Sequence, residues 1–120
     1  MRRIKTTNPE LINLIRFLKK RAQEDDAKIW RAVADRLSKP RQRRAAVNLS
    51  RLNRHTQASE TVVVPGKVLG VGIVDHPIYV AAFAFSEKAK SKISKAKGKC
   101  LTFEELMKKN PKGTKVKIIG

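Results

Sequence analysis

Basic side chains are concentrated in one stretch in the middle of the chain, residues 39–55, which contains no acidic residue. Most of these basic side chains are arginines. A guanidinium group offers a rigid, bidentate fork of N–H donors that matches a phosphate, and its flat face can stack on an unpaired base. The stretch therefore predicts an RNA-binding segment, with a solvated linker as the plainer alternative. The predicted contact residues are Lys39, Arg41, Arg43, Arg44, Arg51, Arg54 and His55.

A second basic set belongs to a predicted helix. Ser86 and Glu87 are typical of a helix start, because a serine can cap the first amides and a carboxylate is favoured at the positive end of the helix dipole. Like charges three or four residues apart oppose helix formation unless phosphates or neighbouring groups compensate them. The lysines therefore predict an RNA-facing helix, with a merely solvated face as the alternative. The predicted contacts are Lys88, Lys92, Lys95 and Lys99, beside an inward stripe of Ala89, Ile93, Ala96 and Cys100.

Groups that could catalyse a reaction are few. The chain has two histidines, one cysteine and ten carboxylates, and their spacing is not typical of an active site or a metal site. His55 and His76 are expected to contact solvent or RNA. The Gly70-Val71-Gly72 sequence lacks the third glycine and the following helix of a dinucleotide-binding motif, so its glycines are expected to serve backbone packing. We predict no enzyme activity, cofactor, metal or small-molecule substrate.

Motifs for base-specific recognition are also missing. The sequence contains no Cys/His finger, no paired aromatic strands of the RRM type and no GXXG loop of the KH type. Its six aromatic residues are too few for a base-stacking platform. This composition favours recognition of folded RNA through its charge and shape.

The whole chain shares this basic character. Its 120 residues include 28 Lys and Arg against 10 Asp and Glu, for a formal net charge of +18. A small protein with such a charge usually binds a polyanion, most often nucleic acid. An anionic membrane is the competing partner, but the longest apolar stretch, residues 77–85, is far shorter than the ~20 residues that span a bilayer. We expect a cytoplasmic protein, without a disulfide because Cys100 is its only cysteine.

Helices are predicted to precede the basic stretch. The first begins at Asn8, a suitable N-cap, with Pro9 at its first position. The second covers about residues 27–37 and ends before a proline. Val47 and Leu49 alternate like a short strand, and Leu52 adds a buried anchor. We expect one domain, residues 1–120, made of a helical part (1–38), the basic segment (39–55) and an α/β core (56–120).

The α/β core is predicted from valine-rich runs. Residues 61–74 indicate sheet, interrupted by a turn at Pro65-Gly66 and resumed up to Val74. Residues 78–85 indicate a second buried strand that leads directly into the lysine-rich helix. The later predicted elements are a short helix with a capping box formed by Thr102 and Glu105, and a half-exposed strand at residues 115–118.

Several blocks of sequence together resemble one known family. They are TNPELINLIRFLKK, WRAVADRLSKPRQRRAAVNLSRLNRHT, VVVPGKVLGVG, AFAFSEKAKSKISKAKG and TFEELMKKNPKGTKVKIIG, which cover nearly the whole chain. In their order and spacing the chain resembles the archaeal ribosomal protein L-eighteen-e (L18e) family. That family is similar in fold to ribosomal protein L-fifteen, with which it shares VNLSRL, KVLG and FSEKA.

The resemblance implies both a fold and a function. The implied fold is α/β, with irregular β-β-α superhelical turns preceded by N-terminal helices. The implied function is a structural constituent of the large ribosomal subunit that binds 23S-type rRNA and neighbouring ribosomal proteins, without catalysis. We expect residues 39–55 to lie along the rRNA backbone and the helix over residues 88–99 to supply a second contact. The alternative is a nucleoid-associated or general RNA-binding basic protein, which would show no preference for folded rRNA over duplex DNA.

Overall fold

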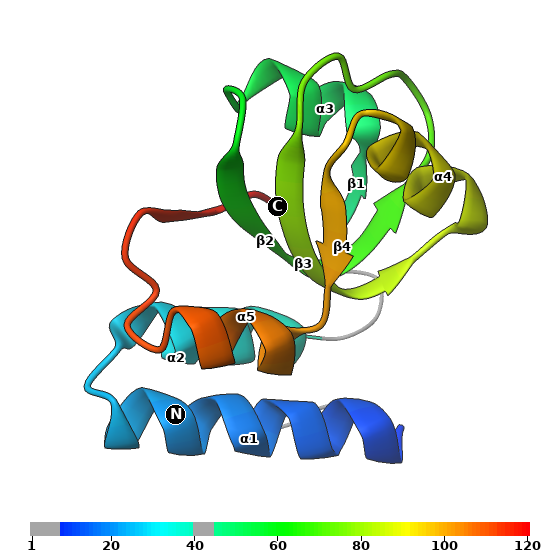
Figure 1. Ribbon diagram of the computed structural model, residues 1–120. Helices are drawn as coiled ribbons and strands as arrows, with labels where there is room; N and C mark the ends of the chain where they lie inside the picture. Colours follow the sequence, from blue (N-terminus) through cyan, green and yellow to red (C-terminus); the bar gives the residue numbers. More distant parts are fainter. Residues whose placement is uncertain (1–7, 40–44) are drawn as a thin grey trace.

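A computed structural model describes residues 8–39 and 45–120 (Figure 1). Within these residues the chain forms the predicted mixed α/β fold, with five helices around a sheet of five strands. The elements in chain order are α1 (Pro9–Glu24), α2 (Lys28–Leu37), β1 (Ala45–Asn48), α3 (Leu49–Arg54), β2 (Glu60–Leu69), β3 (Ile78–Phe85), α4 (Glu87–Lys95), β4 (Lys99–Leu101), α5 (Phe103–Lys109) and β5 (Val116–Ile118).

Every strand pairing in the described sheet is parallel. The strand order is β1-β2-β3-β4, and β5 also pairs with β2. β1 pairs with residues 66–69 of β2, whereas β5 pairs with residues 61–63. Because β3 occupies the other edge of β2 along most of its length, β1 and β5 share a single edge, one after the other.

β2 is continuous where the sequence predicted a turn. It pairs with β3 on both sides of Pro65-Gly66, but the register shifts between Val64 and Lys67. A proline cannot donate a hydrogen bond to the ladder and is tolerated within a sheet at such irregularities. The predicted turn is therefore wrong, and the two residues form an irregularity inside one strand.

Alternate residues of the strands face two separate cores. Val63, Ala81 and Leu101 pack against α1, α2 and α5. Their neighbours Val62 and Val80 pack against α3 and α4. Burial of both faces explains why β2 and β3 are nearly continuous apolar runs. We call the two sets of helices the α1/α2/α5 layer and the α3/α4 layer; Figure 1 shows them on opposite sides of the sheet.

The α1/α2/α5 layer confirms the local signals in the sequence. The Asn8 side chain caps α1 by accepting hydrogen bonds from the amides of Glu10 and Leu11. The side-chain oxygen of Thr102 accepts from the Glu105 amide, and Glu105 Oε1 accepts from the Thr102 amide, so the predicted capping box is present. These caps satisfy amides that a helix start would otherwise leave unpaired.

Leu49 begins helix α3 and does not extend the strand before it. β1 ends at Asn48, and the predicted strand through Leu49 is wrong. Leu49 and Leu52 are both fully buried, as expected for residues three apart on one side of a helix. The predicted role of Leu52 as a buried anchor is confirmed.

Helix α4 begins as predicted but ends earlier. The Ser86 side chain accepts a hydrogen bond from the Ala89 amide, and the helix ends at Lys95. Lys97 has a φ of +65°, and a Cβ on Gly98 would lie only 2.2 Å from the Ile78 carbonyl oxygen. The chain therefore turns here and enters β4, so the predicted helix through Lys99 is wrong. Cys100 accordingly belongs to a strand beside β3.

Residues 70–77 connect β2 to β3 without forming a strand, so the predicted strand up to Val74 is wrong. Because the two strands are parallel, this connection has to return to the beginning of the sheet. It does so in contact with both helices of the α3/α4 layer. The Ser50 amide at the start of α3 donates to the Val71 carbonyl oxygen, and Lys92 Nζ on α4 donates to the carbonyl oxygen of Gly70.

Candidate nucleic-acid interface

Helix α3 carries the described part of the basic stretch. The side chains of Arg51, Arg54 and His55 are exposed, while the buried leucines on the opposite side fix the helix on the sheet. These three side chains form no hydrogen bond or ion pair with any other described residue, and so they are available to an external ligand. Lys39 lies half-buried after α2. The remaining predicted contacts, Arg41, Arg43 and Arg44, lie outside the described residues.

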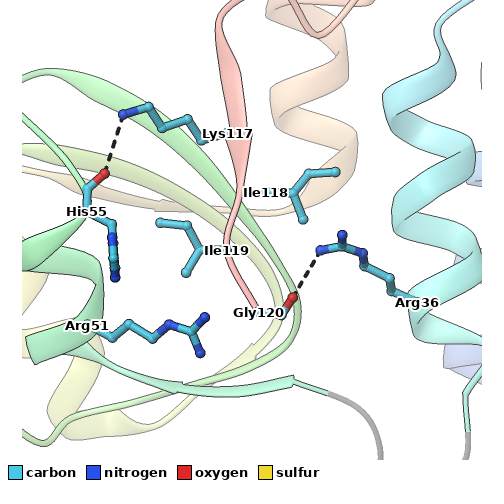
Figure 2. A pocket seen from close by; sticks show the side chains of 7 residues that line it. All are labelled: Arg36, Arg51, His55, Lys117, Ile118, Ile119 and Gly120. Atoms are coloured by element: carbon cyan, nitrogen blue, oxygen red, sulfur yellow. Dashed lines mark hydrogen bonds between the residues drawn. The ribbon is translucent and has the colours of Figure 1, made fainter.

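A hollow of about 520 Å³ opens between α2, α3 and β5 (Figure 2). Arg36 Nη1 donates to the main-chain oxygen of Gly120 at 3.0 Å, and Lys117 Nζ donates to the carbonyl oxygen of His55 at 3.4 Å. Figure 2 marks both hydrogen bonds with dashed lines. The Arg51 side chain enters the same hollow from α3 and has no such partner. The lining residues are Arg36, Arg51, His55, Lys117, Ile118, Ile119 and Gly120.

A glutamate compensates one of the basic groups in this hollow. Lys117 Nζ lies 3.0 Å from Glu60 Oε2. The amide of Gln57 donates to the Glu60 carboxylate, and this hydrogen bond, followed by that from Lys117, lowers the pKa of Glu60. Because Glu60 is paired with Lys117, the Arg51 guanidinium is the cationic group of this hollow without a described partner. The presence of Arg36 and Lys117 here was not predicted, because it depends on β5 pairing with the same edge of β2 as β1, and on α2 packing nearby.

The predicted row of lysines on α4 divides into different environments. Lys88 and Lys95 are exposed and form no ion pair with another described residue. Lys90 lies 3.6 Å from the carboxylate of Glu87. Lys92 is half-buried, and its Nζ donates to two carbonyl oxygens of residues 70 and 72, at 2.8 and 2.6 Å. The structure therefore gives Lys92 internal partners, while Lys88 and Lys95 face solvent.

Lys99 lies apart from this row. It belongs to β4 and lines a second hollow, of about 360 Å³, with Lys90 and Lys109. Cys100 lies in the same hollow, where burial raises the pKa of its thiol. The sequence did not single out Lys90 and Lys109 as contacts, because their convergence requires α4, β4 and α5 to be in place.

His76 has internal partners, contrary to the prediction that it contacts solvent or RNA. Its ring nitrogens lie 2.8 Å from Asp75 Oδ1 and 2.8 Å from Thr56 Oγ1, and its side chain is only 17% exposed. The hydrogen bond with His76, followed by that with Asn53, lowers the pKa of Asp75. These contacts join the 70–77 connection to the end of α3. His76 is therefore a structural residue.

Charges are distributed unequally between the two helical layers. The helices of the α1/α2/α5 layer and the turn after α1 contain nine Lys and Arg residues and seven Asp and Glu residues. The helices of the α3/α4 layer contain six basic residues and a single acidic one, Glu87. Since clustered cations without acidic neighbours create a positive surface potential, the α3/α4 layer is the better candidate for a polyanion contact.

The described residues also show which kinds of site are missing. No group of three His, Cys, Asp or Glu side chains among residues 8–39 and 45–120 could hold a metal ion. Over the same residues, no helix is long and apolar enough to cross a membrane.

Comparisons with known proteins give close relatives. Residues 2–120 match the model of the family described as "Ribosomal protein 60S L18 and 50S L18e". The chain is 52% identical over 118 residues to "Large ribosomal subunit protein eL18" of Methanoregula boonei, and the match covers 98% of each chain. The protein of the same name from Methanothermobacter thermautotrophicus is 50% identical, and the match covers 99% of this chain and 98% of the relative. That from Archaeoglobus fulgidus is 47% identical, and the match covers 97% of this chain and 99% of the relative.

Proposed function

Because the chain belongs to the ribosomal protein family 60S L18 and 50S L18e, and is thus a protein of the large ribosomal subunit, we propose that it binds and stabilises folded rRNA through basic surfaces. The resemblance found in the sequence is confirmed at the level of the family. That family is a structural ribosomal one and not a class of enzymes. The proposed partners are 23S-type rRNA and neighbouring large-subunit proteins, in ribosomes of the cytoplasm.

One observation supports the rRNA contact most directly, namely the charge of the α3/α4 layer. Arg51 and Arg54 on α3 and Lys88 and Lys95 on α4 are exposed without a described acidic partner. A phosphate that contacts such a group replaces only water and counterions, so no internal ion pair has to be broken. We assign phosphate binding to these four residues, together with His55 beside Arg51.

The other predicted contacts have different places in this proposal. Lys92 holds the 70–77 connection, and we assign it to positioning rather than to phosphate binding. Lys99 lies in the separate hollow on β4, where it can contact a second part of the RNA. Lys39, with Arg41, Arg43 and Arg44, remains a predicted contact that the sequence alone supports. Replacing Arg43 and Arg44 by Glu should weaken RNA binding by orders of magnitude, and unchanged binding would remove that stretch from the proposal.

The salt dependence of binding tests how many phosphates are involved. Binding that neutralises roughly eight phosphates gives a log-log slope of affinity against salt near −6 to −7. We expect this slope for an in vitro transcript of large-subunit rRNA, measured by filter binding over a series of salt concentrations. A slope near −2 would contradict an extended interface.

Sedimentation of a native extract tests the proposal in the cell. The protein is followed by mass spectrometry through a sucrose gradient, before and after a high-salt wash. We expect it to migrate with large subunits and to survive the wash, because a purely electrostatic association would be removed. Recovery with chromosomal DNA, or free at the top of the gradient, would contradict stable rRNA binding and favour a nucleoid-associated or general RNA-binding protein.

A further inference from the structure

Two large apolar side chains are exposed on the α3/α4 side of the molecule. Val71 is 62% exposed and Ile73 is 69% exposed, and they are the only large hydrophobic residues so exposed in the described part of the chain. Both belong to the 70–77 connection between β2 and β3. A single exposed aliphatic residue needs no explanation, but two within three residues of one connection call for a partner.

The backbone of this connection is held in place on both sides. On one side, the Ser50 amide donates to the Val71 carbonyl oxygen at 3.1 Å, and the Asn53 side-chain oxygen accepts from the Asp75 amide at 3.1 Å. On the other side, the ammonium group of Lys92 bridges the carbonyl oxygens on either side of Val71. A loop with this many anchors loses little conformational entropy when it binds a partner.

Glycines allow the connection to lie directly against both helices. A Cβ on Gly70 would lie 2.7 Å from Lys88 Cβ on α4. A Cβ on Gly72 would lie 2.6 Å from Ser50 Cβ on α3, and Gly72 has a φ of +94°, which L side chains rarely adopt. The apolar pair is thereby fixed between the two helices to which we assign phosphate binding.

We propose that Val71 and Ile73 form an apolar contact with an unstacked base in a non-helical part of the bound rRNA. This inference rests on the proposed function, since an RNA that contacts the cations of both α3 and α4 has to pass over the connection between them. Aliphatic side chains find apolar surface in RNA chiefly on base faces. In a regular helix those faces are covered by stacking, so the target is a bulge, a loop or a helix end.

The surroundings of the pair favour RNA over a protein partner. A stable protein interface buries about 800 Å² on each partner, whereas two aliphatic side chains cover only a small part of such an area. The exposed side chain of Lys88 lies against Gly70, next to Val71. The exposed Asp75 carboxylate, two residues beyond Ile73, is hydrogen-bonded to the His76 ring. A cation next to a small apolar contact suits a nucleotide, which carries a phosphate beside its base.

The test removes the apolar surface without changing charge. In V71T/I73T both residues remain β-branched, so backbone preferences are kept while methyl groups are lost. Binding is measured with two probes, an in vitro transcript of large-subunit rRNA and a perfectly paired RNA duplex without unpaired nucleotides. We expect a roughly tenfold loss of affinity for the transcript, an unchanged salt slope and no change for the duplex.

Controls make the outcome decisive. The variant V71I/I73V keeps the apolar character and should bind the transcript like the wild type, and all variants should show the wild-type thermal unfolding midpoint. Equal binding of V71T/I73T and wild type to the transcript would overturn the inference while leaving the proposed function intact. If that variant also failed to enter large subunits, a protein partner would be indicated. Failure of the wild type to bind the transcript would instead refute the proposed function.

Discussion

The two helical layers cover the same sheet, yet they hold their charged side chains in different ways. In the α1/α2/α5 layer, Arg21 lies 3.2 Å from Asp25 and Lys20 lies 3.9 Å from Glu24. In the α3/α4 layer, one described ion pair involves a helix residue, between Lys90 and Glu87. The cations of the first layer are largely balanced by nearby acids, whereas those of the second are not.

This difference teaches that net charge alone does not locate a binding surface. Basic residues are more numerous in the helices of the α1/α2/α5 layer than in those of the α3/α4 layer. What differs is the number of acidic neighbours, together with the apolar residues that each layer buries. The α1/α2/α5 layer contains Trp30, which is fully buried. We expect this layer to contribute most to stability and the α3/α4 layer to provide the proposed RNA contact.

The largest expected effect is on the free energy of unfolding, to which we expect the α1/α2/α5 layer to contribute most. Trp30 is fully buried, and its Nε1 donates to the Pro111 carbonyl oxygen at 2.6 Å. W30A should lower the free energy of unfolding by about 3–5 kcal/mol, because it leaves a cavity and an unpaired carbonyl. Denaturant unfolding followed by circular dichroism measures this loss. A change below about 1 kcal/mol would show that this layer is not the main source of stability.

The next prediction concerns RNA binding by the α3/α4 layer. R51E/R54E should weaken binding to an rRNA transcript roughly 100-fold or more at physiological salt, since two phosphate contacts become repulsive. The matched control is R16E/R31E, which makes the same change in net charge at exposed positions of α1 and α2. Gel-shift titrations compare the two. Equal losses would mean that the RNA responds to total charge and would remove the distinction between the layers.

Substitutions of Lys92 and Lys95, both on α4, distinguish a lysine that positions the 70–77 connection from one that binds phosphate. K92M removes two charge-assisted hydrogen bonds to carbonyls and should destabilise the fold by about 1–3 kcal/mol, with the salt slope of RNA binding unchanged. K95M should leave stability within about 0.5 kcal/mol and reduce the steepness of the slope by about 0.7–0.9. The reverse pattern would place Lys92 on the phosphates and contradict its assignment.

The smallest expected effect is a pH dependence at Glu60. The hydrogen bonds from Gln57 and Lys117 lower the pKa of Glu60 in the folded chain. A lowered pKa stabilises the fold above the unfolded value of about 4.3, and this contribution is lost as the pH falls through the folded value. E60Q should therefore show a shallower loss of unfolding midpoint between pH 6 and pH 3. The control is E104Q, which should lose its unfolding midpoint with falling pH as the wild type does. If E60Q also loses its midpoint as the wild type does, this role of Glu60 is contradicted.

Sequence reasoning succeeded where a local signal decides the outcome. The cap at Asn8, the cap at Ser86 and the capping box at Thr102 are each set by a few neighbouring residues, and all three are confirmed. It failed where tertiary contacts decide. Pro65-Gly66 is typical of a turn in isolation, but pairing with β3 on both sides keeps the chain extended. The end of α4 depends on the fit of Gly98 against a carbonyl of β3.

The candidate site shows the same division. Arg51, Arg54 and His55 are exposed because the leucines of α3 are buried on its opposite side, whereas the sequence indicated no helix at these residues. The internal partners of Lys92 and His76 could not be predicted, because these contacts depend on the path that the 70–77 connection takes past α3 and α4. A lysine at helical spacing has the same sequence signal whether it faces solvent or a carbonyl.

The parallel pairing of all the strands has a consequence for how the chain folds. Among the described strands no pair can form as a hairpin, since even the closest paired positions of β2 and β3, such as Lys67 and Ala84, are 17 residues apart, and Val62 and Lys117 are 55 apart. Closing such long loops costs entropy before any contact compensates for it, which slows folding. α1 and α2, which are adjacent in sequence, can associate early. Until β5 arrives, part of the β2 edge lacks its partner, and we expect the newly made chain to be most prone to aggregate at that stage.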